Sequence, residues 1–105
     1  MKLIRTNTCP EDGSILYAFR CPACGHAHGF TVGGTNPHGQ PRWTFNGNFE
    51  KPTFTPSLRC MDQRPGAKDW FTSCHLVLTD GMIAYCGDCP HAFAGKTVPM
   101  VPFDD

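Results

Sequence analysis

The sequence predicts a single, mostly β domain over residues 1–105, made of short antiparallel hairpins with little helix. The 11 glycines and 10 prolines make up a fifth of the 105 residues, and both types disfavour the interior of long regular elements. Apolar and polar residues alternate along several short segments, which is the period of a half-buried strand. A chain of this length buries only about 60–65% of its unfolded surface, so a metal or disulfides would add needed stability.

Two strands are expected in the N-terminal third. The segment 14–21, SILYAFRC, places Ile15, Tyr17 and Phe19 on one face. The segment 26–32, HAHGFTV, follows after the short turn CPACG and reads as the second strand. The glycine- and proline-rich stretch GGTNPHGQP then forms a loop.

The segment 42–58, RWTFNGNFEKPTFTPSL, carries bulky aromatic side chains between turn residues. Asn46-Gly47 is a common hairpin-turn dipeptide, and Pro52 and Pro56 restrict the later part to an edge strand or an irregular strand. The aromatic side chains are expected to fill the core, because the chain lacks long aliphatic runs. The alternative is a platform on which single-stranded nucleic acid stacks. The side chains concerned are Trp43, Phe45, Phe49 and Phe54.

The clearest hairpin is predicted over 73–86, SCHLVLTDGMIAYC, with a two-residue turn at Asp80-Gly81. That turn sets the register of the whole hairpin and places His75 opposite Cys86, with Cβ atoms about 5 Å apart. Two ligands of one ion can have that separation. One face of the hairpin is expected to face the core, and it carries Cys74, Leu76, Leu78, Ile83 and Tyr85.

Charge and leader signals argue against several classes of protein. Nine basic and nine acidic residues give a net charge of zero, so strong binding to a phosphate backbone is not expected. The N-terminal segment MKLIRTNTCP lacks an apolar signal-peptide region, and no stretch approaches about 18 apolar residues, so no membrane span is expected. The expected location is the cytoplasm, where thiols stay reduced. The odd number of cysteines, seven, also favours metal over a disulfide framework.

A metal-binding knuckle stands at Cys21-Pro22-Ala23-Cys24-Gly25. Zinc favours thiolate and imidazole ligands in tetrahedral sites, and C-x-x-C is its usual half-site. The glycine after the second cysteine lets backbone amides approach the sulfurs. Cys21 and Cys24 are therefore the first two predicted ligands of a structural zinc.

The other two ligands are predicted in the C-terminal half. A second C-x-x-C pair, Cys86 with Cys89, lies much further from Cys24 than the roughly 15–20 residues usual in a zinc ribbon. Neighbours on a strand point to opposite faces, so only one of Cys74 and His75 is expected to bind the metal, and His75 lies beside the second pair. The predicted ligand set is Cys21, Cys24, His75 and Cys89, and Cys74, Cys86 and His91 remain alternatives for the last two.

Three segments resemble an uncharacterised family of small proteins that is common in phage and prophage genomes and is sometimes labelled ammonia monooxygenase. They are FRCPACGHAHGF, WTFNGNFEKPTFTPSL and CHLVLTDGMIAYCGDCPHAFAGKTV, and together they cover about half of the chain. A copper or membrane oxygenase would need histidine clusters or membrane spans, so these residues do not support the oxygenase label. The resemblance implies a shared fold core that contains Cys21, Cys24, Cys74, His75, Asp88, Cys89, His91 and Gly95.

The function expected from these patterns is that of a phage- or prophage-encoded accessory protein, which carries a structural zinc and binds an unknown protein partner. No hydrolase motif such as H-E-x-x-H is present, so no catalytic residue is assigned and an enzyme is the less expected class. The alternative is a zinc-dependent or thiol-based enzyme with Asp88 or His91 as acid or base. The two differ in coordination, because a catalytic zinc keeps an open position for water. A nucleic-acid-binding module is a weaker alternative.

Overall fold

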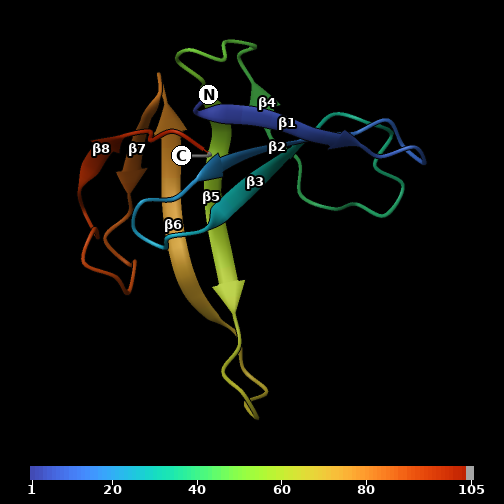
Figure 1. Ribbon diagram of the computed structural model, residues 1–105. Coiled ribbons are helices and arrows are strands. Elements are labelled where there is room, and N and C mark those ends of the chain that lie inside the picture. The colour runs from blue at the N-terminus through green and yellow to red at the C-terminus, as the bar shows by residue number, and fades with distance from the viewer. Residues whose placement is uncertain (104–105) are drawn as a thin grey trace.

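The computed structural model describes residues 1–103 and contains eight β-strands in two antiparallel sheets (Figure 1). The strands are β1 (Leu3–Thr8), β2 (Ile15–Arg20), β3 (Ala27–Val32), β4 (Thr44–Phe45), β5 (Phe54–Asp62), β6 (Phe71–Thr79), β7 (Met82–Tyr85) and β8 (Thr97–Pro99). The first three form one sheet and the other five form the second, each in chain order. Over residues 1–103 there is no helix that could cross a membrane. The predicted mostly β class is confirmed.

The N-terminal sheet contains both predicted strands, as β2 and β3, and adds β1 at its edge. The segment Leu3–Thr8 shows no strand signal, because Leu3 is buried, Ile4 is half-buried and the other four residues are exposed. Its pairing with β2 is what makes it a strand, and its register shifts between Arg5 and Asn7. A bulge of this kind is common at a sheet edge.

The two sheets pack across one another, with the N-terminal sheet lying over β5 (Figure 1). Aromatic rings fill the space between them. Phe30 stacks on Phe54 with ring centroids 4.1 Å apart and on Phe19 at 5.6 Å, and Phe45 stacks on Phe54 at 4.6 Å. Phe49 is 37% exposed and lies at the rim. The expectation that the aromatic segment fills the core is therefore confirmed for Phe45 and Phe54.

β6 and β7 form the predicted hairpin in the predicted register. The turn residues Asp80 and Gly81 have φ angles of 50° and 76°, which is the left-handed region that a type I′ turn requires at both positions. The amide of Cys86 donates to the His75 carbonyl at 2.8 Å, so the ladder continues one pair beyond β7. The predicted core face is buried along its whole length, at Cys74, Leu76, Leu78, Ile83 and Tyr85.

The connection between β4 and β5 is wider than the turn dipeptide predicts. β4 pairs with the start of β5, but residues 46–53 form a loop in place of a two-residue turn at Asn46-Gly47. The side-chain oxygen of Asn46 accepts hydrogen bonds from the amides of Asn48 and Thr53, both at 3.1 Å. Asn46 therefore closes a broad loop across its base.

β5 is irregular, as its prolines predict, although it lies inside the sheet between β4 and β6. The stretch Phe54–Leu58 of β5 lies opposite the shorter stretch Leu76–Leu78 of β6. β5 therefore bulges between its two paired ends. Bulges redirect side chains, and this one carries Ser57.

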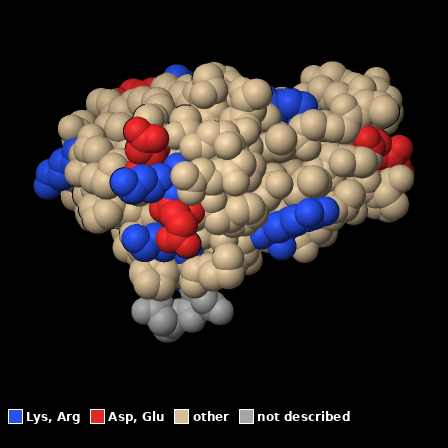
Figure 2. Space-filling view, turned by 90° about the horizontal axis from the view of Figure 1, so that it is seen from above, with Lys and Arg blue, Asp and Glu red and all other residues tan. Residues whose placement is uncertain are grey.

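Both signs of charge are interspersed on the face of the molecule seen in Figure 2, where basic and acidic side chains lie next to one another. This distribution matches the net charge of zero. A single-sign stripe of the kind that follows a nucleic-acid backbone does not occur on that face.

Replacing Phe30 by Ala tests the aromatic core. Phe30 is fully buried between rings from both sheets, so Phe30→Ala should cost about 3–5 kcal/mol of unfolding free energy. Urea unfolding at constant metal load measures this loss. The matched control is Phe49→Ala, which removes the same ring from a partly exposed position and should cost clearly less. Equal losses in the two variants would contradict a core centred on Phe30.

Candidate active site and metal centre

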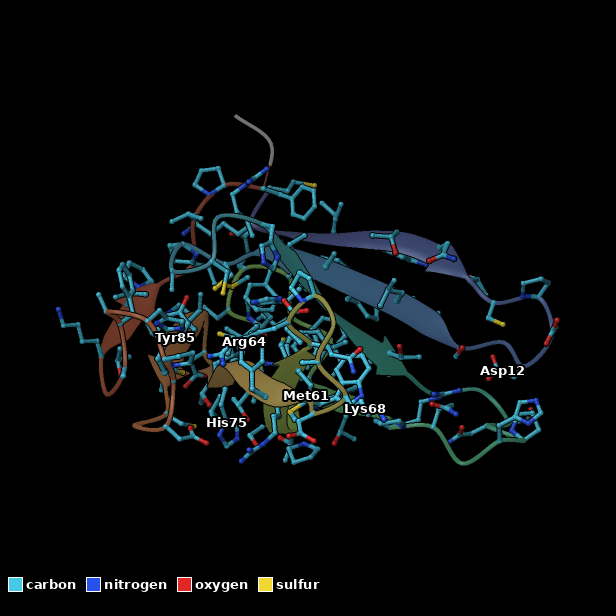
Figure 3. All side chains as sticks on the ribbon, turned by 90° about the horizontal axis from the view of Figure 1, so that it is seen from below. Asp12, Met61, Arg64, Lys68, His75 and Tyr85 are labelled. Atoms are coloured by element: carbon cyan, nitrogen blue, oxygen red, sulfur yellow. The ribbon has the colours of Figure 1, made fainter. Side chains whose placement is uncertain are left out.

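Two groups of polar side chains lie on opposite faces of β6. Cys74 and His75 are consecutive residues, so their side chains point to opposite sides of the strand. Cys74 is fully buried in the core, and the His75 side chain is 17% exposed on the outer face. Figure 3 places His75 and Tyr85 at one end of the molecule, with Asp12 at the far end.

On the core face, cysteine and histidine side chains from both sheets come together. One possible ligand atom of each residue lies within 4.8 Å of the others, in the group formed by Cys21, Cys24, His28 and Cys74. The knuckle turn is closed by a hydrogen bond from the Gly25 amide to the Cys21 carbonyl at 2.8 Å. Gly25 has a φ of 77°, which explains the glycine at this position. The group joins the knuckle and β3 to β6 of the other sheet.

His28 shows the sign of a missing partner. Its Nε2 atom is buried and makes no hydrogen bond, while its Nδ1 atom lies 3.5 Å from the Cys60 sulfur. An unpaired buried nitrogen is costly, and such atoms are rare in folded proteins. A metal ion bound to Nε2 and to the three neighbouring sulfurs would satisfy it. The residues present therefore fit a sulfur-rich metal site.

The electrostatics of the core group favour a positive charge. Hydrogen bonding between the two sulfurs lowers the pKa of Cys21 and raises that of Cys74, so the pair holds one stabilised thiolate. Burial lowers the pKa of His28, but the neighbouring Cys21 and Cys60 sulfurs outweigh it and raise the pKa to about 10. A bound divalent cation would stabilise the negative charge of the sulfurs more strongly than one proton on His28.

Two further side chains support the sulfurs from outside the group. The Tyr85 hydroxyl lies 3.0 Å from the Cys21 sulfur, and His91 Nε2 lies 3.4 Å from the Cys74 sulfur. The amide of Phe93 donates to His91 Nδ1 at 3.2 Å, so a neutral His91 carries its proton on Nε2. His91 is therefore arranged to donate to the Cys74 sulfur, as outer partners of metal ligands often do.

On the outer face, a serine, a histidine and an aspartate form a continuous chain of hydrogen bonds. Ser57 Oγ lies 3.1 Å from His75 Nε2. On the other side of the ring, His75 Nδ1 lies 3.0 and 3.2 Å from the two carboxylate oxygens of Asp88. An ionised carboxylate only accepts, so Nδ1 carries the proton and Nε2 can accept the proton of the Ser57 hydroxyl. This is the arrangement of a Ser–His–Asp catalytic triad.

Asp88 is held ionised by its neighbours. The hydrogen bond with His75 is the main cause that lowers the pKa of Asp88, and the nearby Arg59 charge acts in the same direction. Arg59 lies 3.3 Å from the Asp88 carboxylate and donates to the Thr72 hydroxyl at 2.9 Å. Arg59 thus links the carboxylate to β5 and β6.

Backbone contacts hold the serine and the histidine in place. The amide of His75 donates to the Cys89 sulfur at 3.2 Å, and that thiol donates back to the His75 carbonyl at 3.0 Å. The Trp43 indole donates to the Ser57 carbonyl at 3.2 Å, which anchors the bulge of β5. Hydrogen bonds therefore hold the backbone of both Ser57 and His75 in place.

The four predicted zinc ligands do not come together in one group. Cys21 and Cys24 lie in the core group, together with His28 and Cys74. His75 is not in that group, because the alternation of β6 turns it to the outer face, and Cys89 lies against the His75 backbone. Asp88, the alternative acid or base of a zinc enzyme, lies beside His75 on the outer face.

Sequence reasoning missed Ser57 altogether. Ser57 has no flanking motif such as G-x-S-x-G. The hairpin signal at Asp80-Gly81 predicts the pairing of β6 with β7, but it does not show which strand pairs with the other edge of β6. The pairing of β5 with β6 is what brings Ser57 to His75. His28 is a further member of the core group that the sequence patterns do not single out, and it is only 8% exposed.

Comparison with known proteins gives a family. The family model for the bacterial ubiquitination-like system serine protease (BubE) matches residues 4–86. No curated protein and no solved structure matches the chain. The match includes Ser57 and His75 and ends two residues before Asp88. The resemblance to an uncharacterised family of small phage and prophage proteins is thus confirmed only as membership of a small bacterial family, and the match gives no evidence of a phage or zinc-binding family. Because the match covers most of the sequence, the chain belongs to the BubE family.

Proposed function

We propose that this chain is a serine protease of a bacterial ubiquitination-like system. Ser57 is the nucleophile, His75 the general base, and Asp88 the residue that orients His75. The single observation that carries the proposal is the hydrogen-bond chain from Ser57 Oγ through the two nitrogens of His75 to the Asp88 carboxylate. The family description supports the same class of activity.

The chemistry follows from the positions of the protons. As Ser57 Oγ attacks a substrate carbonyl carbon, its proton passes to His75 Nε2, and Asp88 stabilises the imidazolium that forms. The proton on Nε2 then moves to the leaving group, and an acyl group remains on Ser57. Water attacks this ester with His75 again as base, which releases the acid and restores the hydroxyl.

The core group is proposed to hold a structural zinc. The group offers four protein ligands, and a closed four-ligand set is typical of structural zinc, whereas catalytic zinc keeps a position for water. Zinc is favoured because three of the four donors are sulfurs. When bound, it would supply stability to the fold by joining the two sheets, and it would take no part in the hydrolysis.

The proposed activity also bears on the partner, the origin and the location of the protein. The protein partner expected from the sequence is, in this view, a substrate polypeptide of the ubiquitination-like system. A phage or prophage origin stays a prediction from the resemblance. A cytoplasmic location is supported by the seven cysteines, none of which forms a disulfide.

Removing His28 tests the metal centre. His28→Ala deletes the nitrogen proposed to bind zinc, so the purified variant should contain far less than stoichiometric zinc and should unfold at a lower temperature. Elemental analysis and thermal unfolding measure the two effects. His26→Ala is the matched control, since His26 is an exposed histidine two residues away. Equal zinc content in the two variants would show that the core group is not the metal site.

Replacing Ser57 tests the nucleophile. A fluorophosphonate reacts with an activated serine by forming a stable phosphonyl ester, so the wild-type chain should gain one label, localised to Ser57 by mass spectrometry. Ser57→Ala should abolish the label. Ser73→Ala, which removes a serine hydroxyl from the neighbouring strand, should retain it. A wild-type chain that takes no label, or a label on another serine, would refute the proposed triad.

Replacing Asp88 tests the orientation of His75. Asp88→Asn removes the carboxylate that accepts the hydrogen bond from Nδ1, so the rate of fluorophosphonate labelling should fall on the order of 10⁴-fold. Asp69→Asn, a change of the same chemistry at an exposed loop position, is the control and should label at the wild-type rate. A rate in Asp88→Asn close to that of the control would remove Asp88 from the triad.

A further inference from the structure

A thiol that the triad does not use lies beside it. Cys86 follows β7 and is hydrogen-bonded through its amide to the His75 carbonyl at 2.8 Å. One possible ligand atom each of His75, Cys86 and Asp88 lies within 4.8 Å of the other two. The three side chains are half-buried or exposed, on the outer face of the molecule. An imidazole, a thiol and a carboxylate at this separation form a partial site for a zinc-like cation.

We propose that His75, Cys86 and Asp88 form a second, regulatory metal site, at which a zinc-like divalent cation reversibly inhibits the protease. This inference rests on the proposed function of Ser57, His75 and Asp88. In this proposal, Cys86 is the ligand that makes the site selective for a cation that favours sulfur. Hydrolysis of a substrate by Ser57 needs no sulfur, so the triad does not use Cys86.

The inhibition follows from the tautomer of His75. In the triad, Nδ1 carries a proton that it donates to Asp88, and the Nε2 lone pair accepts the proton of Ser57. A cation that binds Nδ1 and the Asp88 carboxylate displaces that proton, and a neutral imidazole must then carry its proton on Nε2. Nε2 can no longer accept the Ser57 proton, so the serine loses its general base. The Cys86 thiol releases its proton to solvent as it binds the metal.

A positive side chain competes for the same place. The Arg59 guanidinium lies 3.3 Å from the Asp88 carboxylate and 3.5 Å from His75 Nδ1. The Arg59 side chain is 50% exposed, so it can move into solvent when a cation enters. This competition, together with only three protein ligands, makes the outer site weaker than the closed core group. The outer site can therefore empty and fill while the core group keeps its metal.

Zinc titration of fluorophosphonate labelling tests the proposal. Wild-type protein, Cys86→Ser and Cys9→Ser are each titrated with added Zn²⁺, and every rate is divided by the rate of the same variant without added zinc. We expect Cys86→Ser to need at least roughly tenfold more zinc for half-inhibition, because one of three protein ligands is weakened. Cys9→Ser, which changes a half-buried cysteine outside the triad and the core group, should follow the wild type. Equal midpoints for wild type and Cys86→Ser would overturn the proposal.

A second measurement is independent of protease activity. Protein whose core group is loaded with zinc is titrated with Co²⁺, and the sulfur-to-cobalt charge-transfer absorption is followed. A saturable band is expected in the wild type and in Ser57→Ala, and its loss is expected in Cys86→Ser. A wild type without such a band, or a band retained in Cys86→Ser, overturns the site. If Ser57 takes no label but the cobalt band depends on Cys86, the proposed protease fails while the metal site stands.

Discussion

The alternation of side chains along β6 is the constraint on which both sites depend. Cys74 and His75 are neighbours in sequence, and the strand sends one into the core and the other to the outer face. A shift of β6 by one residue would exchange the two faces, exposing the Cys74 sulfur and burying the His75 imidazole. The register is set by the left-handed turn at Asp80 and Gly81, so that turn positions both the proposed metal ligand Cys74 and the proposed general base His75.

The proposed metal centre and the proposed triad are thus joined by the single peptide bond between Cys74 and His75. In a chain of 105 residues with a modest core, a bound zinc would contribute folding free energy on the order of 10 kcal/mol, as in zinc-finger peptides. Bound zinc would hold Cys74 against the N-terminal sheet and so limit the movement of His75. Cys89 adds a clamp on the His75 backbone. Serine-protease chemistry needs such rigidity, because misplacement by about 1 Å can cost about 100-fold in rate.

Short sequence motifs predicted the hairpin and the knuckle. They did not predict which strands distant in the sequence come together. The turn dipeptide at Asp80-Gly81 predicted the hairpin register, and the C-x-x-C spacing predicted a knuckle, because both depend on a few adjacent residues. Cys74 and Ser57 reach their sites through contacts between strands far apart in sequence. Cys74 meets Cys21, Cys24 and His28 only because the two sheets pack together, and Ser57 reaches His75 only through the bulged pairing of β5 with β6. Neither packing leaves a periodic pattern in the sequence.

The small size of the domain also explains why the aspartate of the proposed triad is exposed to water, whereas the aspartate of a typical triad is buried. Aromatic rings and the core group occupy the interior, so the Asp88 side chain is 46% exposed to water. Water weakens the electrostatic support that a carboxylate gives to an imidazolium, because the effective dielectric constant is higher there. Arg59 offsets part of this loss by holding the carboxylate ionised and restricting its orientation. The same exposure leaves the Asp88 carboxylate and the Cys86 thiol accessible from solvent, so an active site built on so small a domain is open to ligands that a buried triad would exclude.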